Sequence, residues 1–184
     1  NAIKSWTLLQ PHPEIILFGE DEGTAQMANE LGVLHMPEVA RNEYGTPLLN
    51  DLFERAQRLA THGLLCYVNA DIILMSDRAK AISLVIPRKR RFLIVGQRWD
   101  IEMKEPLDFS VGWEDKLLSY VVSQGQLHPP TGIDYFVFPR GIWGHIPPLA
   151  VGRTTWDNWL IYRARCRGVP VIDATGCIMA VHQN

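Results

Sequence analysis

The chain has 184 residues, which is enough for a sizeable core, and we expect residues 1–184 to form a single domain. Hydrophobic residues make up 47% and charged residues 21%, an ordinary composition for a soluble globular protein. The net charge of −2 gives no overall basic signature for nucleic acid, and no apolar stretch is long enough to cross a bilayer. The basic run Arg88-Lys89-Arg90-Arg91 precedes a predicted strand and is interpreted as a solvated turn.

The three cysteines are an odd number without the spacing of metal ligands. Two of them, Cys66 and Cys177, lie in apolar runs that are typical of core positions. This use of cysteine favours a reducing compartment, so we expect a cytoplasmic protein.

The first half of the chain predicts alternating helices and strands. Thr46 and Pro47 are typical of an N-cap and a first helical position, and apolar residues at helical spacing follow them. Five apolar or aromatic residues at 64–68 predict a strand that is buried on both faces. The elements predicted here are helices over residues 1–9, 25–31, 47–59 and 76–84 and strands over residues 15–18, 33–39, 64–68 and 92–96.

The second half continues the alternation after a less regular stretch. We expect helices over residues 113–123 and 154–167 and strands over residues 135–138, 169–173 and 177–181. Residues 140–153 are rich in Gly and Pro and predict a long loop, and loops of this length are usually functional. The alternation favours an α/β fold with a mainly parallel sheet flanked by helices.

Polar side chains follow several of the predicted strands directly. They are Glu20, Asp21, Asp71, Arg98 and His182. Open α/β sheets bind ligands outside the carboxyl ends of their strands, so these residues predict a ligand site along one sheet edge.

The segment Asn69-Ala70-Asp71 ends the central strand and could orient a divalent cation. Carboxylate oxygen suits Mg²⁺ or Mn²⁺, and substrate phosphate would supply further ligands. His182, also at a strand end, becomes a second candidate ligand when it is considered together with Asp71. The alternative is that Asp71 caps the turn that follows it.

Three further acidic segments have both a structural and a functional interpretation. The acidic turn at residues 20–22 could complement a helix dipole, or it could accept hydrogen bonds from a ribose or a base. Asp157 follows Thr154 by three residues, which predicts an acidic capping box, and its carboxylate could also act as a general base. The competing pair Glu114 and Asp115 is interpreted as a helix N-terminus.

Taken in order, these segments resemble motifs of the GT-A fold glycosyltransferases, especially the family 2-like members. Residues 20–24 resemble the acidic turn of type D-D-G-S, and Asn69-Ala70-Asp71 resembles the D-x-D motif with Asn in place of the first acid. Residues 155–157 resemble the x-E-D motif with Trp156 in place of its first acid, and His182 corresponds to the C-terminal metal-binding histidine. Residues 113–115 match x-E-D more literally but precede the strand at 135–138.

The resemblance implies a GT-A (Rossmann-like) fold whose first strand is missing from this chain, in a domain truncated at both ends. It implies transfer of a sugar from a nucleotide-diphosphate donor to an acceptor hydroxyl, with inversion and with Mn²⁺ or Mg²⁺ as cofactor. The residues it implies are Glu20, Asp21, Asn69, Asp71 and Arg153 for the donor, Asp71 and His182 for the cation, Trp143, Trp156 and Asp134 for the acceptor, and Asp157 as the catalytic base.

Two other functions remain open at this point. A sugar-nucleotide nucleotidyltransferase would need a Gly-rich basic loop near the N-terminus, and none is visible. A non-catalytic nucleotide-sugar-binding domain is favoured slightly by Asn69, which leaves the cation site one carboxylate short.

Overall fold

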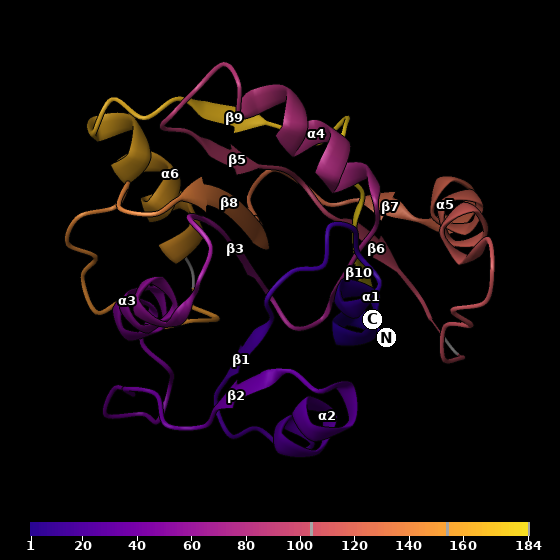
Figure 1. Ribbon diagram of the computed structural model, residues 1–184, viewed down its shortest axis with the longest axis horizontal. Coiled ribbons are helices and arrows are strands. Elements are labelled where there is room, and N and C mark those ends of the chain that lie inside the picture. Colours follow the sequence, from indigo (N-terminus) through magenta and orange to yellow (C-terminus); the bar gives the residue numbers. More distant parts are fainter. Residues whose placement is uncertain (104, 154, 184) are drawn as a thin grey trace.

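The computed structural model describes residues 1–103, 105–153 and 155–183 (Figure 1). Its helices are α1 (Ala2–Thr7), α2 (Thr24–Leu31), α3 (Leu49–Leu59), α4 (Asp77–Val85), α5 (Trp113–Gln124) and α6 (Trp156–Cys166). Its strands are β1 (Ile16–Phe18), β2 (Leu34–Met36), β3 (Leu64–Val68), β4 (Ile72–Leu74), β5 (Leu93–Val95), β6 (Trp99–Ile101), β7 (Gln126–Leu127), β8 (Tyr135–Pro139), β9 (Val171–Asp173) and β10 (Ala180–Gln183). None of these helices has the length and hydropathy that a membrane crossing requires.

The described strands form three small sheets of mixed direction. β1 and β2 pair in parallel, and the other two sheets have the strand orders β3-β8-β5-β9 and β4-β10-β6-β7. β8 runs antiparallel to both β3 and β5, β10 runs antiparallel to β4, and β7 runs antiparallel to β6. The predicted mainly parallel sheet of the GT-A type is therefore wrong.

The error has a physical reason. A continuous apolar run shows that a strand is buried on both faces, but it carries no information about strand direction. β8 is such a run, and the chain inserts it between β3 and β5 in the opposite direction. Phe136 and Phe138 then point to one face of this sheet and Tyr135 and Val137 to the other, and both faces are buried.

Four loops without a helix connect the two four-stranded sheets, and α4 makes a fifth connection, from β4 to β5. β3 leads into β4, β5 into β6, β7 into β8 and β9 into β10. The crossing from β5 to β6 needs glycine at position 96, because a Cβ there would collide with the Tyr135 hydroxyl and lie 3.0 Å from the Thr175 backbone nitrogen. The Asn69 N–H donates to the Asp134 carbonyl at 3.0 Å, and Gln97 donates to both the Thr175 hydroxyl and the His128 carbonyl, so these four loop crossings meet at one junction between the sheets.

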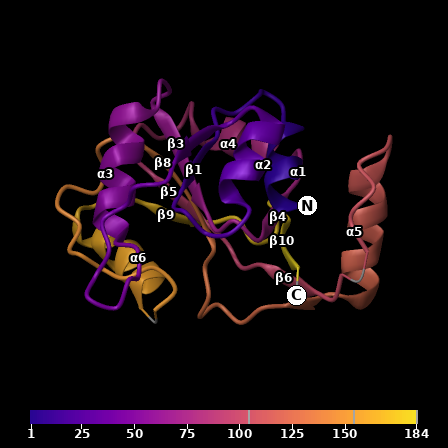
Figure 2. The same ribbon diagram turned by 90° about the horizontal axis from the view of Figure 1, so that it is seen from below.

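Two clusters of buried side chains hold the elements together. α3 and α6 cover one face of the β3-β8-β5-β9 sheet, where Phe53 stacks on Phe138 with ring centroids 5.4 Å apart. The other face packs toward α1, α4 and the β4-β10-β6-β7 sheet, and the Trp6 indole donates a 2.8 Å hydrogen bond to the Ile72 carbonyl. Figure 2 shows α3 and α6 on one side of the molecule and α5 on the other.

Most predicted elements are confirmed, with shifted ends. The helix predicted from Pro47 begins at Leu49, because Pro47 and Leu48 form β-bridges with Arg41 and Ala150 instead. The strand predicted at 177–181 begins at residue 180, because residues 177 and 178 turn back to bond the Ala174 carbonyl. The short strands β4, β6 and β7 were not predicted.

Candidate functional site

A chain of charged and polar side chains lies where the crossings meet. At its outer end the Oδ2 atom of Asp71 lies 3.3 Å from the Nε2 atom of His182. On the other side of the ring, the Nδ1 atom of His182 lies 3.4 Å from the Oδ1 atom of Asp100, in charge contact but without hydrogen-bond alignment. The three residues come from the β3–β4 crossing, β10 and β6, and Figure 2 shows β4, β6 and β10 close together.

The chain continues inward through hydrogen bonds. The other Asp100 oxygen lies 2.7 Å from the Nδ1 atom of His128, and the Arg98 Nε atom donates to Asp100 at 2.8 Å. Arg98 also donates through Nη1 to Asp134 at 2.7 Å, and the Asn69 amide donates to the second Asp134 oxygen at 2.6 Å. We call these seven residues the junction network.

The junction network has a buried end and an open end. The Asp134 side chain is only 9% exposed, and both of its oxygens accept hydrogen bonds. The Asp71 side chain is 51% exposed. Asp134 therefore helps to hold the junction together, and Asp71 faces the solvent with its less exposed partner His182 beside it.

Hydrogen bonds and charge determine the protonation of the inner residues. Burial acts to raise the pKa of Asp100, but the hydrogen bonds from His128 and Arg98 outweigh it and hold that pKa below its usual range. Burial acts to lower the pKa of Arg98, but Asp134 and Asp100 together keep it above its usual value. Both side chains are therefore charged at neutral pH.

Asp157 lies in the first turn of α6, beside the junction network. Asp157 is 8% exposed, and its Oδ2 atom accepts a 3.3 Å hydrogen bond from the backbone N–H of Ile133. Ile133 directly precedes Asp134 of the junction network. Thr155 is the N-cap of α6 and has a φ of 89°, a strained value for a residue other than glycine. Thr154, predicted as the N-cap, lies outside the described residues.

The predicted donor residues at 20, 21 and 153 lie elsewhere. Glu20 and Asp21 follow β1, which lies in the separate two-stranded sheet (Figure 1). A Glu20 carboxylate oxygen lies 3.7 Å from the Arg41 guanidinium. Arg153 is exposed in the turn before α6. Among the described residues, no hydrogen bond or ion pair joins these three side chains to the junction network.

The two tryptophans predicted to stack on an acceptor sugar are core residues. Trp143 is 1% exposed and packs edge-on against Phe53 and Phe138, with centroids 5.8 and 5.1 Å away. Trp156 is 7% exposed and packs edge-on against Tyr67 at 5.2 Å. Their rings are covered by neighbouring aromatic side chains, so the predicted acceptor surface is not formed by them. Asp134, predicted with them, is engaged by Arg98 and Asn69 instead.

Of the competing acids at 114 and 115, Glu114 has a structural role at the start of α5. The Glu114 carboxylate accepts a 2.9 Å hydrogen bond from the Ser76 backbone N–H and a second one from the Ser76 hydroxyl. Ser76 is the N-cap of α4, so Glu114 ties the beginnings of two helices together.

Replacing Glu114 should therefore affect stability and not ligand binding. We expect Glu114→Ala to lower the free energy of unfolding by about 1 kcal/mol, because the N-cap of α4 loses its acceptor. Urea denaturation measures this, with Asp115→Ala as the matched control on the same turn. An unchanged unfolding midpoint would contradict the structural role.

Asp71 and His182 are the pair that fits a divalent cation. Two neighbouring ligands of a cation with bonds of about 2.1 Å lie roughly 3 Å apart, and the separation of Asp71 Oδ2 from His182 Nε2 is 3.3 Å. The amide of Asn69 is turned toward Asp134, so it does not join them. Within residues 1–103, 105–153 and 155–183, no group of three or more His, Cys, Asp or Glu side chains is arranged for a metal ion. Asp71 and His182 alone supply two ligands, so a cation at this place would need its remaining ligands from water or from a bound anion.

Sequence reasoning missed Asp100 and His128. Asp100 lies in β6, whose three residues, Trp99-Asp100-Ile101, are too few to show the period of a strand. His128 is placed by its backbone, whose N–H donates to the Arg98 carbonyl at 2.9 Å. No local sequence pattern predicts this hydrogen bond.

The fold and the site together define an α/β protein with a polar network at the junction of two mixed sheets, in which a half-exposed carboxylate is paired with a partly buried imidazole. Neither a protein-family model nor a curated protein matches this chain. Function is therefore inferred from the geometry of the site and from the motifs of the sequence.

Proposed function

We propose that the junction network binds a nucleotide-diphosphate sugar and that the protein transfers the sugar to an acceptor hydroxyl. The observation that carries the proposal is the pair Asp71 and His182. These side chains come from distant parts of the chain and lie 3.3 Å apart at the open end of the network. The resemblance to glycosyltransferases names the same two residues as cation ligands, and the distance between them supports that assignment.

The charge of the network supports dependence on a cation. Asp71, Asp100 and Asp134 contribute three carboxylates, whereas Arg98 contributes one guanidinium. A diphosphate alone would be repelled by this excess of negative charge. A divalent cation bound at Asp71 and His182 would neutralise the diphosphate and stabilise it as a leaving group.

The inner residues of the network would position the binding pair. Asp100 lies beside the His182 nitrogen that faces away from Asp71, and a carboxylate at that place fixes the orientation of a ligating imidazole. Arg98 in turn holds Asp100 and Asp134 on either side of its guanidinium. The open end is thereby supported by a rigid, buried end.

Asp157 would serve as the general base. The Ile133 N–H bonds one of its oxygens, and Ile133 directly precedes Asp134 of the network. An aspartate at the start of a helix, next to a strained N-cap, is held in a defined position. Removal of the acceptor proton by this carboxylate would give inversion at the sugar carbon. We also propose the cytoplasmic location that the cysteine pattern predicts.

Calorimetric titration with UDP and GDP tests the binding part of this proposal. The wild-type protein should bind one of them in Mn²⁺ and lose that binding in chelator. Because each substitution removes a ligand of the pair, Asp71→Asn and His182→Ala should weaken binding by about tenfold or more. Asp115→Asn and His145→Ala, which alter an exposed carboxylate and an exposed imidazole outside the network, are the matched controls.

Other outcomes would point to other functions. Equal binding with and without Mn²⁺ would contradict the role of the pair. Stronger stabilisation by UTP than by a UDP-sugar would favour a nucleotidyltransferase. Tight binding of a UDP-sugar without hydrolysis or transfer would favour a non-catalytic binding domain.

A further inference from the structure

The sheet edge opposite the junction network carries a different surface. β3, β5 and β9 begin at this edge, and β8 ends there, since Leu64 pairs with Pro139 and Leu93 pairs with Val171. The Arg140 N–H donates to the Gly63 carbonyl at 2.8 Å, which brings the segments around β3 and β8 together. The topology therefore gathers the ends of four strands and the segments next to them on one side of the molecule.

This side is strongly basic, and we call it the basic edge. Its cationic residues come from the last turn of α3, from the segments before β5 and β9 and from the end of β8. They are Arg58, Arg88, Lys89, Arg90, Arg91, Arg140, Arg165 and Arg167. Glu14 also lies here, because its carboxylate accepts a 2.8 Å hydrogen bond from the Thr61 backbone N–H. The cations far exceed the acids, although the whole chain has a net charge of −2.

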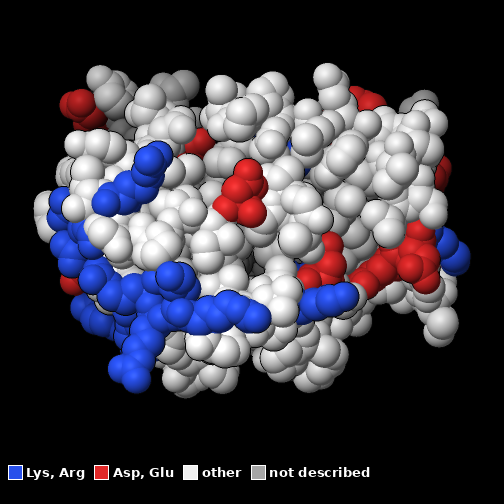
Figure 3. All heavy atoms as spheres, turned by 90° about the horizontal axis from the view of Figure 1, so that it is seen from above, with Lys and Arg blue, Asp and Glu red and all other residues white. Residues whose placement is uncertain are grey.

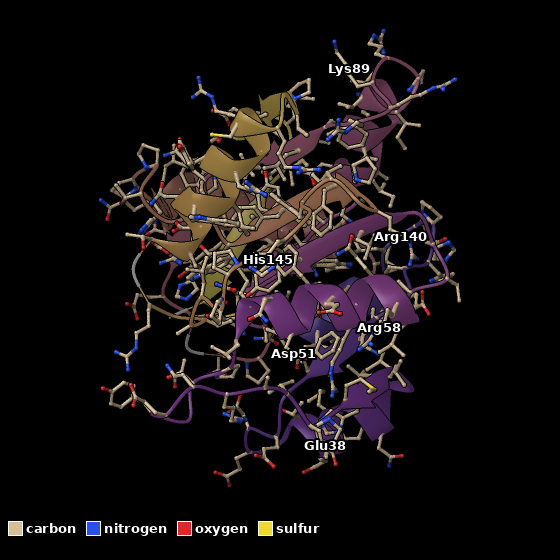
Figure 4. The ribbon with its side chains drawn as sticks, turned by 90° about the vertical axis from the view of Figure 1, so that its left-hand side faces the viewer. Glu38, Asp51, Arg58, Lys89, Arg140 and His145 are labelled. Carbon is tan, nitrogen blue, oxygen red and sulfur yellow. The ribbon has the colours of Figure 1, made fainter. Side chains whose placement is uncertain are left out.

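The figures show how these side chains are presented. Figure 4 shows Arg58, Arg140 and Lys89 along the same side of the molecule, with the loop of Lys89 projecting beyond the rest. Figure 3 shows Lys and Arg side chains merging into a broad basic surface over one part of the face, with acidic side chains mainly toward the other part. The basic edge is therefore a coherent surface and not a set of scattered charges.

Exposed apolar side chains directly precede the basic run. Leu84, in the last turn of α4, is 54% exposed, and Ile86, the C-cap of that helix, is 52% exposed. Arg88, Lys89, Arg90 and Arg91 follow, and all four are exposed. The sequence alone favoured a solvated turn here. A solvated turn does not need two exposed aliphatic side chains next to four consecutive cations.

We propose that the basic edge docks on an anionic phospholipid bilayer, with Leu84 and Ile86 entering the headgroup boundary. A peripheral protein binds such a surface through two features, a cluster of cations and exposed apolar side chains beside it. Proteins that bind single-stranded nucleic acid add stacking aromatic rings to their cations, and residues 84–91 contain none. Because the junction network lies at the opposite edge, it stays open to solvent when the basic edge rests on lipid.

Vesicle sedimentation of the full chain tests this proposal. The protein should sediment with vesicles of phosphatidylcholine and phosphatidylserine, stay in solution with phosphatidylcholine alone, and be released by high salt. Arg90→Gln combined with Arg91→Gln should weaken binding by roughly 30-fold, from the loss of two charges near the surface. Lys4→Gln combined with Lys116→Gln removes the same charge from α1 and α5 and should bind like the wild type.

Further variants and a nucleic-acid probe test the role of the apolar side chains, the location of the binding surface and the choice of lipid as partner. Ile86→Ser should weaken binding to the anionic vesicles without changing its salt dependence, and an unchanged affinity would overturn the insertion of apolar side chains. An equal loss of vesicle binding in the two double variants would overturn the localisation of binding to the basic edge. Binding of a single-stranded RNA oligonucleotide together with absence from the vesicle pellet would overturn the lipid proposal. Circular dichroism of each variant checks that it remains folded.

Discussion

An Asp157→Asn variant is expected to lose sugar transfer by about 100-fold to 10,000-fold, the usual contribution of a positioned general base. Asparagine keeps the shape of the side chain and can still accept the hydrogen bond from the Ile133 N–H. What it loses is the ability to take the proton from the acceptor hydroxyl. Binding of UDP in Mn²⁺ should remain like that of the wild type, because Asp71 and His182 are unchanged.

Single-turnover transfer from a radiolabelled nucleotide sugar measures this effect separately from donor binding. Asp115→Asn is the matched control, because Asp115 belongs to the alternative acid pair and is exposed in the first turn of α5. Transfer that survives in Asp157→Asn and disappears in Asp115→Asn would move the base to the other motif.

An Asp134→Ala variant is expected to lower the free energy of unfolding by about 3–5 kcal/mol, the usual effect of removing one partner from a buried ion pair. The Asp134 side chain is 9% exposed and that of Arg98 is 19% exposed, so solvent screens the pair weakly. The substitution leaves the Arg98 guanidinium and the Asn69 amide without their shared acceptor. It should also weaken binding of UDP, because the inner end of the network is lost.

Urea denaturation of Asp134→Ala, Arg98→Met and the double variant measures the coupling between the two residues. The double variant should be less destabilised than the sum of the single variants, because no buried charge is then left without a partner. Asp108→Ala is the control, since the Asp108 carboxylate bonds only its own turn at Ser110 among the described residues. Additive single effects would show that the buried pair is not a unit.

Local sequence patterns predicted the elements of this fold well. Apolar periodicity located α3, α5 and α6 and the buried strands β3, β5 and β8 to within a few residues. These predictions succeed because helix and strand periods depend on neighbouring residues alone. The short strands escaped, since three residues are too few to show a period.

The candidate site was predicted in part. Asp71 and His182 were paired on motif order, and the structure brings them to 3.3 Å. Asp157 was assigned to the same site, and it accepts a hydrogen bond from the N–H of Ile133, the residue that precedes Asp134 of the network. Trp143 and Trp156 were wrong as surface residues, because a tryptophan in a Gly-rich loop or a first helical turn gives no local signal of whether its ring is covered.

The sequence by itself determined the local elements and the residue types that can bind a cation or accept a proton. Strand direction was decided only by the tertiary structure, since β8 could pair with β3 and β5 in either sense until the crossings placed it. The partners of each charge were decided in the same way, because a buried carboxylate such as Asp134 needs hydrogen bonds from whichever donors the fold brings within reach. Here those donors are Arg98 and Asn69, from two other crossings. Because both donate to Asp134, neither covers Asp71, which stays open to solvent.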